Sequence, residues 1–111
     1  MSEKLLKNIA KEEILRLSDL VQIQPGQVVS KTLSQNAAVS VTLFAFDKGE
    51  EISTHESNGD AMVTVLEGSG KFTVDGVEYL LKENETLVMP AKKPHAVYAE
   101  ECFKMSLVVI F

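Results

Sequence analysis

The chain has 111 residues, of which 45% are hydrophobic and 24% charged, and its formal net charge is −5. This length predicts a single domain with its own core, and the composition is typical of a globular protein. The acidic balance, the lack of tryptophan and the lack of a basic stripe argue against a nucleic-acid partner. No apolar run approaches the ~20 residues of a membrane span. The single cysteine, Cys102, favours a reducing compartment, so we expect a cytoplasmic protein without membrane contact.

The first part of the chain has apolar residues at roughly helical spacing. They form two short groups, at 5–9 and 14–21, so we expect residues 3–20 to be helical in two pieces. Pro25-Gly26 then ends the helical pattern. We therefore expect residues 1–27 to form an N-terminal helical segment that covers one flank of the protein. An arm that reaches a partner subunit is the alternative.

After Pro25 the hydrophobic period changes from helical to two, which is typical of strands. In residues 39–46, apolar residues occupy one face and phenylalanines the other, so both faces are expected to be partly buried. Asp75-Gly76 is the strongest hairpin signal and predicts a type I′ turn. Short strands with turns at regular intervals predict an all-β body over residues 28–111, a sandwich or a barrel. The expected strands are 28–33, 39–46, 51–55, 61–67, 71–74, 77–81, 86–89, 95–99 and 103–110.

The stretch GEEISTHESNGDAMVTVLEG has the spacing of the first of two motifs of a known family, the cupins. In that family the motif reads glycine, five residues, H-x-H, three or four residues, glutamate, six residues and glycine. Gly49, His55 and Gly68 stand at the matching positions. The chain therefore resembles the cupins, which are small barrels of the jelly-roll type.

The stretch NETLVMPAKKPHAV resembles the second cupin motif, which reads glycine, five residues, P-x-G, two residues and histidine. Pro90 and His95 match, while Asn84 and Lys92 stand where the family has its two glycines. The resemblance covers residues from about 28 to 110. It implies a cupin-type double-stranded β-helix, a jelly-roll barrel, after the short N-terminal helical segment.

The candidate site departs from the family pattern at two positions. A full cupin site resembles three histidines and one glutamate gathered on a metal inside the barrel. Here Ser57 replaces the second histidine and Ala61 replaces the glutamate. The resemblance therefore implies His55 and His95 as the remaining metal ligands, with Ser57 lining the site. The implied ion is a weakly bound divalent transition metal: zinc, nickel, iron or copper. In the alternative interpretation, both histidines are ordinary structural residues.

Asp60 is the candidate for a third ligand. Two histidines and one carboxylate are the donor set of non-haem iron(II) sites. Strand alternation points Asp60 outward if Ala61 points inward, unless the turn through Gly59 rotates it back. The alternative is that Asp60 caps backbone amides in the turn, and both interpretations stay open.

Three functions remain. The first is a small-molecule-binding protein, sensor-like or carrier-like, with a metal held by His55 and His95. The second is a metal-dependent oxygenase that uses these histidines and Asp60. The third is a metal-free isomerase or lyase with a histidine as general base. Binding leads because two of the four family ligands are missing, whereas the identity of the ligand and enzymatic activity stay open.

The pattern of apolar residues also predicts a homodimer. Phe44 and Phe46 share one strand face, and Met62, Thr64 and Leu66 share another. Together they give more apolar surface than one small barrel should expose. Cupins commonly pair through such sheets, so the resemblance implies the same here.

Overall fold

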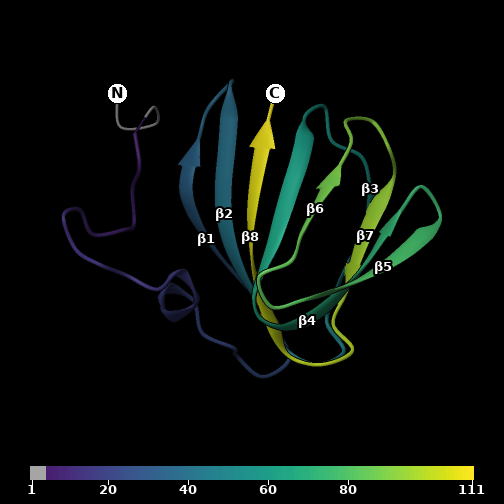
Figure 1. The fold of residues 1–111 in the computed structure, drawn as a ribbon, viewed down its shortest axis with the longest axis horizontal. Helices are drawn as coiled ribbons and strands as arrows, with labels where there is room; N and C mark the ends of the chain where they lie inside the picture. Colours follow the sequence, from purple (N-terminus) through teal and green to yellow (C-terminus); the bar gives the residue numbers. More distant parts are fainter. Residues whose placement is uncertain (1–4) are drawn as a thin grey trace.

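The structure, a computed structural model, describes residues 5–111 as a nearly all-β protein with 54% strand and 4% helix. Antiparallel strands curl into a barrel, so the all-β prediction is confirmed (Figure 1). In the described residues, no helix is long and apolar enough to cross a membrane. The elements are η2 (Leu17–Leu20, a 3-10 turn), β1 (Val28–Gln35), β2 (Val39–Phe46), β3 (Glu51–His55), β4 (Asp60–Val74), β5 (Val77–Lys82), β6 (Thr86–Met89), β7 (His95–Tyr98) and β8 (Phe103–Ile110).

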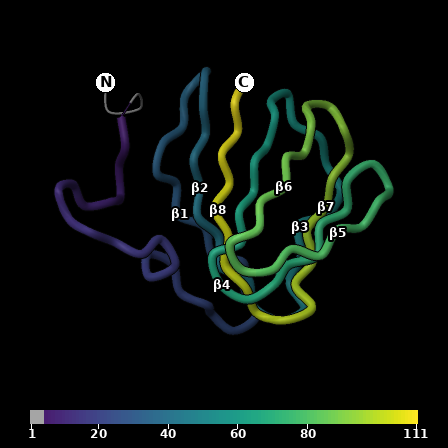
Figure 2. Tube along the Cα trace, viewed as in Figure 1, coloured from purple at the N-terminus to yellow at the C-terminus, as the bar shows by residue number. Residues whose placement is uncertain are grey.

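The long strand β4 joins the two sides of the barrel. The strands are ordered β1-β2-β8-β4-β7-β3, and β5 and β6 also pair with β4. The first half of β4 pairs with β6 and β8, and its second half pairs with β5 and β7. The trace in Figure 2 shows β4 bending at the base of the barrel between these two groups of strands. One strand therefore belongs to both sheets.

The bend in β4 corrects the expectation of separate strands at 61–67 and 71–74. The pairing with β8 shifts register between Val65 and Glu67, which marks a bulge. Gly68 follows with φ 77°, and a Cβ there would lie 2.5 Å from the carbonyl oxygen of Cys102. Only glycine fits this close approach, so the chain changes sheets without leaving the ladder.

The hairpin between β4 and β5 has the predicted turn. Asp75 and Gly76 both have positive φ, 50° and 84°, as a type I′ turn requires. Val74 and Val77 pair directly on either side of the turn. The sequence signal for this hairpin is confirmed.

The prediction of two N-terminal helices is wrong. Between residues 5 and 27 the structure contains one 3-10 turn, η2, and no α-helix, while residues 3 and 4 lie outside the described residues. Isolated helices of fewer than about 12 residues are marginal in water. Arg16, the residue before η2, makes no capping hydrogen bond through its side chain. Packing against the barrel, and not helix propensity, therefore determines the conformation of this segment.

Residues 5–27, here called the strap, do cover one flank of the barrel, as expected. Val21 is buried with Leu33, Leu43 and Ala45 on the outer side of β1 and β2. The ammonium of Lys104 donates a 2.7 Å hydrogen bond to a strap carbonyl. Figure 1 shows the strap beside β1 at the left of the view.

The second face of β2 points into the barrel core, so both faces of this strand are buried as predicted. Phe46 is fully buried and stacks on Phe103 with ring centroids 4.6 Å apart. Phe44 packs against the same core. This corrects the argument for a dimer, because neither phenylalanine adds to the outer surface. Their strand face is covered within the protein.

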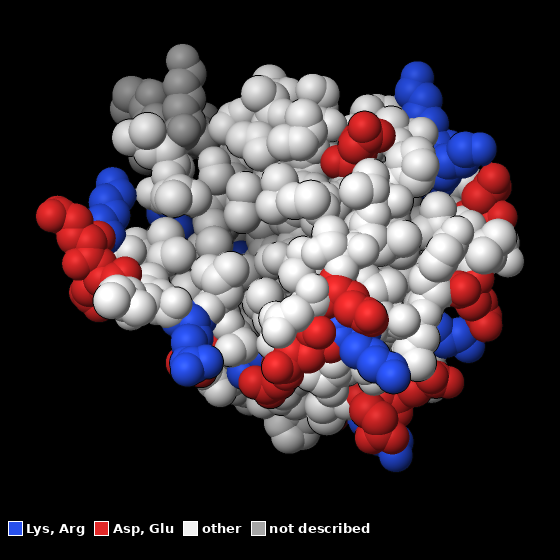
Figure 3. Space-filling view, viewed as in Figure 1, with Lys and Arg blue, Asp and Glu red and all other residues white. Residues whose placement is uncertain are grey.

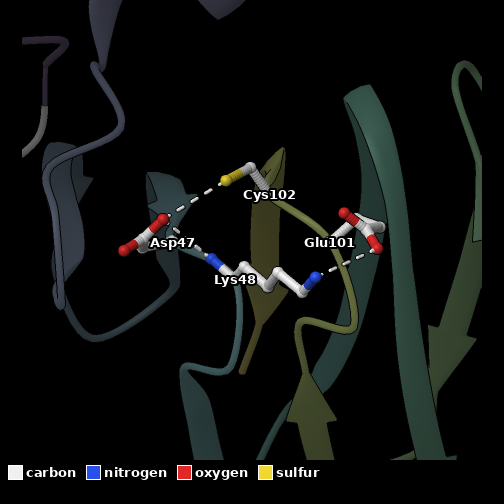
Figure 4. A network of polar contacts seen from close by, with 4 residues as sticks. All are labelled: Asp47, Lys48, Glu101 and Cys102. Carbon is white, nitrogen blue, oxygen red and sulfur yellow. Dashed lines mark hydrogen bonds and ion pairs between the residues drawn. The ribbon is translucent and has the colours of Figure 1, made fainter.

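A polar network at Asp47 ties the end of the strap to the barrel. Figure 4 shows its part between Asp47, Lys48, Glu101 and Cys102. Asp47 accepts hydrogen bonds from the backbone N–H of Gly26, from the Cys102 thiol and from the backbone N–H of Lys48. These bonds, the one from Gly26 first, lower the pKa of the Asp47 carboxyl. Lys48 also pairs loosely with Glu101, at 3.8 Å. Cys102 acts here as a hydrogen-bond donor to a carboxylate.

Candidate functional site

The two histidines lie side by side on neighbouring strands. His55 at the end of β3 is paired with His95 at the start of β7. Their ring centroids are 4.2 Å apart and the ring planes meet at 69°. On its other side, His95 is paired with Val74 of β4. The sheet therefore brings the two motif histidines together.

Both imidazoles are oriented by the same kind of hydrogen bond. Nδ1 of His55 lies 2.9 Å from the carbonyl oxygen of Ser53, and Nδ1 of His95 lies 3.1 Å from that of Lys93. A carbonyl oxygen only accepts hydrogen bonds, so Nδ1 carries the proton in each ring. In the neutral form the lone pair is then on Nε2, the usual arrangement of metal-binding histidines.

The surroundings of the two rings differ. His95 is 4% exposed, whereas His55 is exposed. Burial lowers the pKa of His95, the hydrogen bond to the Lys93 carbonyl works against this, and the charge of protonated His55 lowers it further. The environment therefore favours the neutral imidazole of His95. Such a ring binds metals and accepts protons.

Backbone contacts hold the two motif turns together. The N–H of Lys92 donates to the carbonyl oxygen of Ser57 at 2.7 Å. The N–H of Ala91 donates to Oδ1 of Asp60 at 2.8 Å. The Ser57 hydroxyl accepts from the N–H of Gly59 at 3.2 Å. The β3–β4 turn is thus fixed against the β6–β7 loop beside the histidines.

These contacts show what the other candidate ligands do in this structure. Asp60 is exposed and its carboxylate accepts from a backbone amide, which is the capping role. The Ser57 hydroxyl is engaged within its own turn. Ala61 is 2% exposed and belongs to the apolar core. The two histidines are therefore the candidate site residues whose orientation suits ligation.

A metal fits this arrangement only in part. Two imidazoles with their lone pairs on Nε2 suit zinc, nickel or copper. Within residues 5–111, no group of three or more histidine, cysteine, aspartate or glutamate side chains is placed to hold an ion. Water or a bound ligand would have to complete the shell, so the donor set predicts weak binding.

The two non-glycine residues at motif glycine positions have left-handed backbone. Asn84 has φ 69° and Lys92 has φ 65°. Asparagine tolerates this region, whereas lysine is strained there. The motif thus specifies a backbone shape, and this chain keeps the shape without the glycines.

The sequence interpretation missed a hollow between β5 and β6. Its volume is about 310 Å³, and neither His55 nor His95 is among its lining residues. It is formed where two strands pair with different halves of β4, and no residue motif marks such a place. The lining residues are Val74, Asp75, Val77, Tyr79, Leu87, Val88, Pro90 and Lys93.

Comparison with known proteins identifies the family of the fold. Residues 42–111 match the family model of the cupin domain. A conserved protein of unknown function from Streptococcus pyogenes is 45% identical, with a TM-score of 0.93 over 96% of this chain and 93% of its own. A cupin superfamily protein from Desulfitobacterium hafniense is 34% identical, with a TM-score of 0.91 over 96% of this chain and 97% of its own.

A third structure, a cupin 2 conserved barrel domain protein from Leptotrichia buccalis, is 44% identical with a TM-score of 0.86. The match covers 87% of this chain and 47% of that protein. No curated protein matches this chain. The matched range of the family model includes both motif stretches, and two of the structures match nearly the full length of this chain. The chain therefore belongs to the cupin family.

Proposed function

We propose that this cupin is a small-molecule-binding protein, sensor-like or carrier-like, with a divalent transition metal held weakly by His55 and His95. The observation that carries the proposal is the pair of matched hydrogen bonds from Nδ1 to backbone carbonyls. They favour Nε2 as the metal-binding nitrogen of both rings. A cytoplasmic location is part of the proposal, since a single free thiol suits a reducing compartment.

The protein's own residues would fix the site. The Ser53 and Lys93 carbonyls hold the ring orientations. Asp60 keeps the two motif turns together through the Ala91 amide, and burial keeps His95 neutral. A bound ion would offer open coordination positions to polar atoms of a small molecule. The ligand would thus complete the shell that the chain leaves incomplete.

The enzymatic alternatives are supported unequally. The oxygenase requires Asp60 as third ligand, and its bond to Ala91 weighs against that role. The metal-free isomerase or lyase needs a neutral histidine, and the lowered pKa of buried His95 supports a general base. We therefore rank the His95 general base second and the oxygenase third.

Calorimetric titration of untagged protein with zinc(II) and nickel(II) tests the proposal. We expect about one ion per chain, and His55→Ala or His95→Ala should each weaken binding more than about tenfold. Cys102→Ser is the matched control, because its exposed thiol near Asp47 is another place for a soft ion. Equal affinity in the wild type and both histidine variants would reject the site. Proton transfer by His95 without any metal would favour the second-ranked function.

We also propose that the protein is a homodimer formed through the outer face of β4, β6 and β8. The apolar side chains of Met62, Val88 and Ile110 are exposed there. The strap covers the neighbouring part of the same outer face, so a second copy would complete the cover.

Light scattering across the micromolar range tests the dimer. Met62→Glu should shift the mass to that of a monomer, because it places a charge in the apolar contact. Leu80→Glu, an exposed site on β5, should leave the dimer intact. A monomer mass for the wild type throughout this range would refute the proposal.

A further inference from the structure

The hollow between β5 and β6, here called the slot, exists because these two strands diverge. In the described chain, both strands pair with β4 and with no other strand. β5 pairs with residues 69–74 and β6 with residues 61–64, on different sheets. A space of about 310 Å³ is left between their unpaired edges.

The walls of the slot are apolar and continue into the barrel core. Val77 and Tyr79 lie on the face of β5 that they share with their cross-strand partners Val74 and Phe72, both of which are buried. From the other side, Leu87 of β6 packs against the same core. Val77 nevertheless stays 53% exposed. The slot is an apolar surface that the protein leaves open to solvent.

One end of the slot is fixed by polar contacts. At this end the backbone N–H of Asp75 donates to the carbonyl oxygen of Pro94, and Oδ2 of Asp75 pairs with Nζ of Lys93 at 3.4 Å. Outside the lining residues, the turn that joins β5 to β6 is fixed by Glu85, whose Oε1 accepts from the N–H of Lys82 at 2.7 Å. These contacts hold the two strands that form its walls in place.

The end formed by the β6–β7 loop is basic. Lys92 and Lys93 are adjacent in this loop, and Lys93, which lines the slot, pairs with the carboxylate of Asp75. Figure 3 shows basic side chains at the upper right, where Figure 1 places this loop. An ammonium has three donors, and the bond to Asp75 uses one of those on Lys93. The remaining N–H donors of Lys93 therefore offer a contact for an anion at this end of the slot.

We propose that the slot binds small monocarboxylates with a flat or short apolar body. The carboxylate would accept from Nζ of Lys93, and the apolar body would pack on Val74, Val77 and Leu87. The volume is at the lower end of the range for ligand pockets, so single-ring or short-chain acids fit. Neither histidine lines this site, although Val74 and the Lys93 carbonyl both adjoin His95, and the proposal requires no metal.

Amide chemical-shift mapping of the full chain with phenylacetate, and with neutral phenylacetamide for comparison, tests this proposal. We expect shifts at residues 74–79 and 87–93 and tighter binding of phenylacetate. Lys93→Gln should weaken phenylacetate binding about fivefold and leave phenylacetamide unchanged. Equal binding of the two probes to the wild type would overturn the role of Lys93.

A pair of tryptophan variants on β5 locates the ligand. Val77→Trp fills the slot and should weaken binding more than tenfold. Leu80→Trp is the matched control, because Leu80 is 57% exposed on the opposite face of the same strand. Undiminished binding to a cooperatively folded Val77→Trp variant would reject the slot. The double variant His55→Ala, His95→Ala should retain phenylacetate binding, and its loss would place the ligand at the histidines instead.

Discussion

The two halves of β4 pair with different strands and have different surroundings, although they form one strand. The first half lies between β6 and β8 and carries Ala61 in the apolar core. The second half lies between β5 and β7 and places Val74 beside His95. The metal-binding glutamate of the family pattern would stand at Ala61, so the ligand lost from the first half has become part of the core. The two motif histidines lie on the other sheet.

Rebuilding the first half should have the largest effect. Ala61→Glu together with Ser57→His restores the four-ligand set of the family. Without metal, we expect a loss of at least about 3 kcal/mol in unfolding free energy, because Ala61 is buried among apolar side chains. With zinc, binding should tighten markedly and recover this stability. Thermal melts with and without metal measure both effects. Unchanged metal affinity would show that the two histidines do not converge with these positions.

The next largest effect is expected at the junction between the two halves of β4. Gly68→Ala should lower the free energy of unfolding by about 2–4 kcal/mol, because a Cβ there would meet the Cys102 carbonyl at 2.5 Å and φ is positive. Gly76→Ala is the control, since its φ is also positive but the Cβ would have nothing within 4 Å. Backbone strain alone predicts that Gly76→Ala lowers the free energy of unfolding by about 1 kcal/mol. Urea denaturation distinguishes the two, and equal losses would mean that the close approach at Gly68 relaxes without cost.

A smaller effect is expected in the loop that faces the first half. Lys92→Gly should raise the unfolding free energy by about 0.5–1 kcal/mol, since it relieves left-handed backbone at φ 65°. Asn84→Gly should raise the unfolding free energy by less, because asparagine tolerates the left-handed backbone region. Thermal melts compare the variants. A destabilised Lys92→Gly would indicate that the lysine side chain makes a contact that outweighs the strain.

The smallest effect concerns His95, beside the second half. Its pKa is lowered in the folded state, so the unfolded chain takes up a proton first as pH falls below about 6.5. The stability from neutral His95 is thus present above the unfolded pKa and is lost as pH falls through the folded pKa. His95→Gln should flatten this part of the stability curve, measured by urea denaturation from pH 7.5 to 5. If His95→Gln left the slope of unfolding free energy against pH unchanged, the pH dependence would have to come from other groups.

Much of the fold follows from local patterns in the sequence. Period-two alternation located the strands, and Asp75-Gly76 specified its turn, because both signals act over a few residues. The continuity of β4 could not be predicted in this way, since the glycine at residue 68 signals a break as readily as a bend. The helical spacing before Val21 was misleading because packing on the outer face of β2 outweighs a weak helix propensity.

The candidate site was predictable to the extent that motif spacing reports backbone shape. The spacing placed His55 and His95 together, and the structure pairs them across β3 and β7. It could not decide between the two roles of Asp60, because that depends on which amide lies within reach in the folded chain. The slot at Val77 depends on how two strands diverge, a tertiary property that no stretch of residues encodes.

The strap has a consequence for how the protein withstands stress. It is held by a few side chains and by isolated hydrogen bonds such as the one from Lys104, not by a ladder. We expect it to open locally while the barrel stays folded, so that its amides exchange with solvent earlier than those of β8. Each opening would uncover Leu43 and Ala45 on the outer face of the sheet. The resistance of this cupin to aggregation would then be set by how fast the strap closes again, and not by the stability of the barrel.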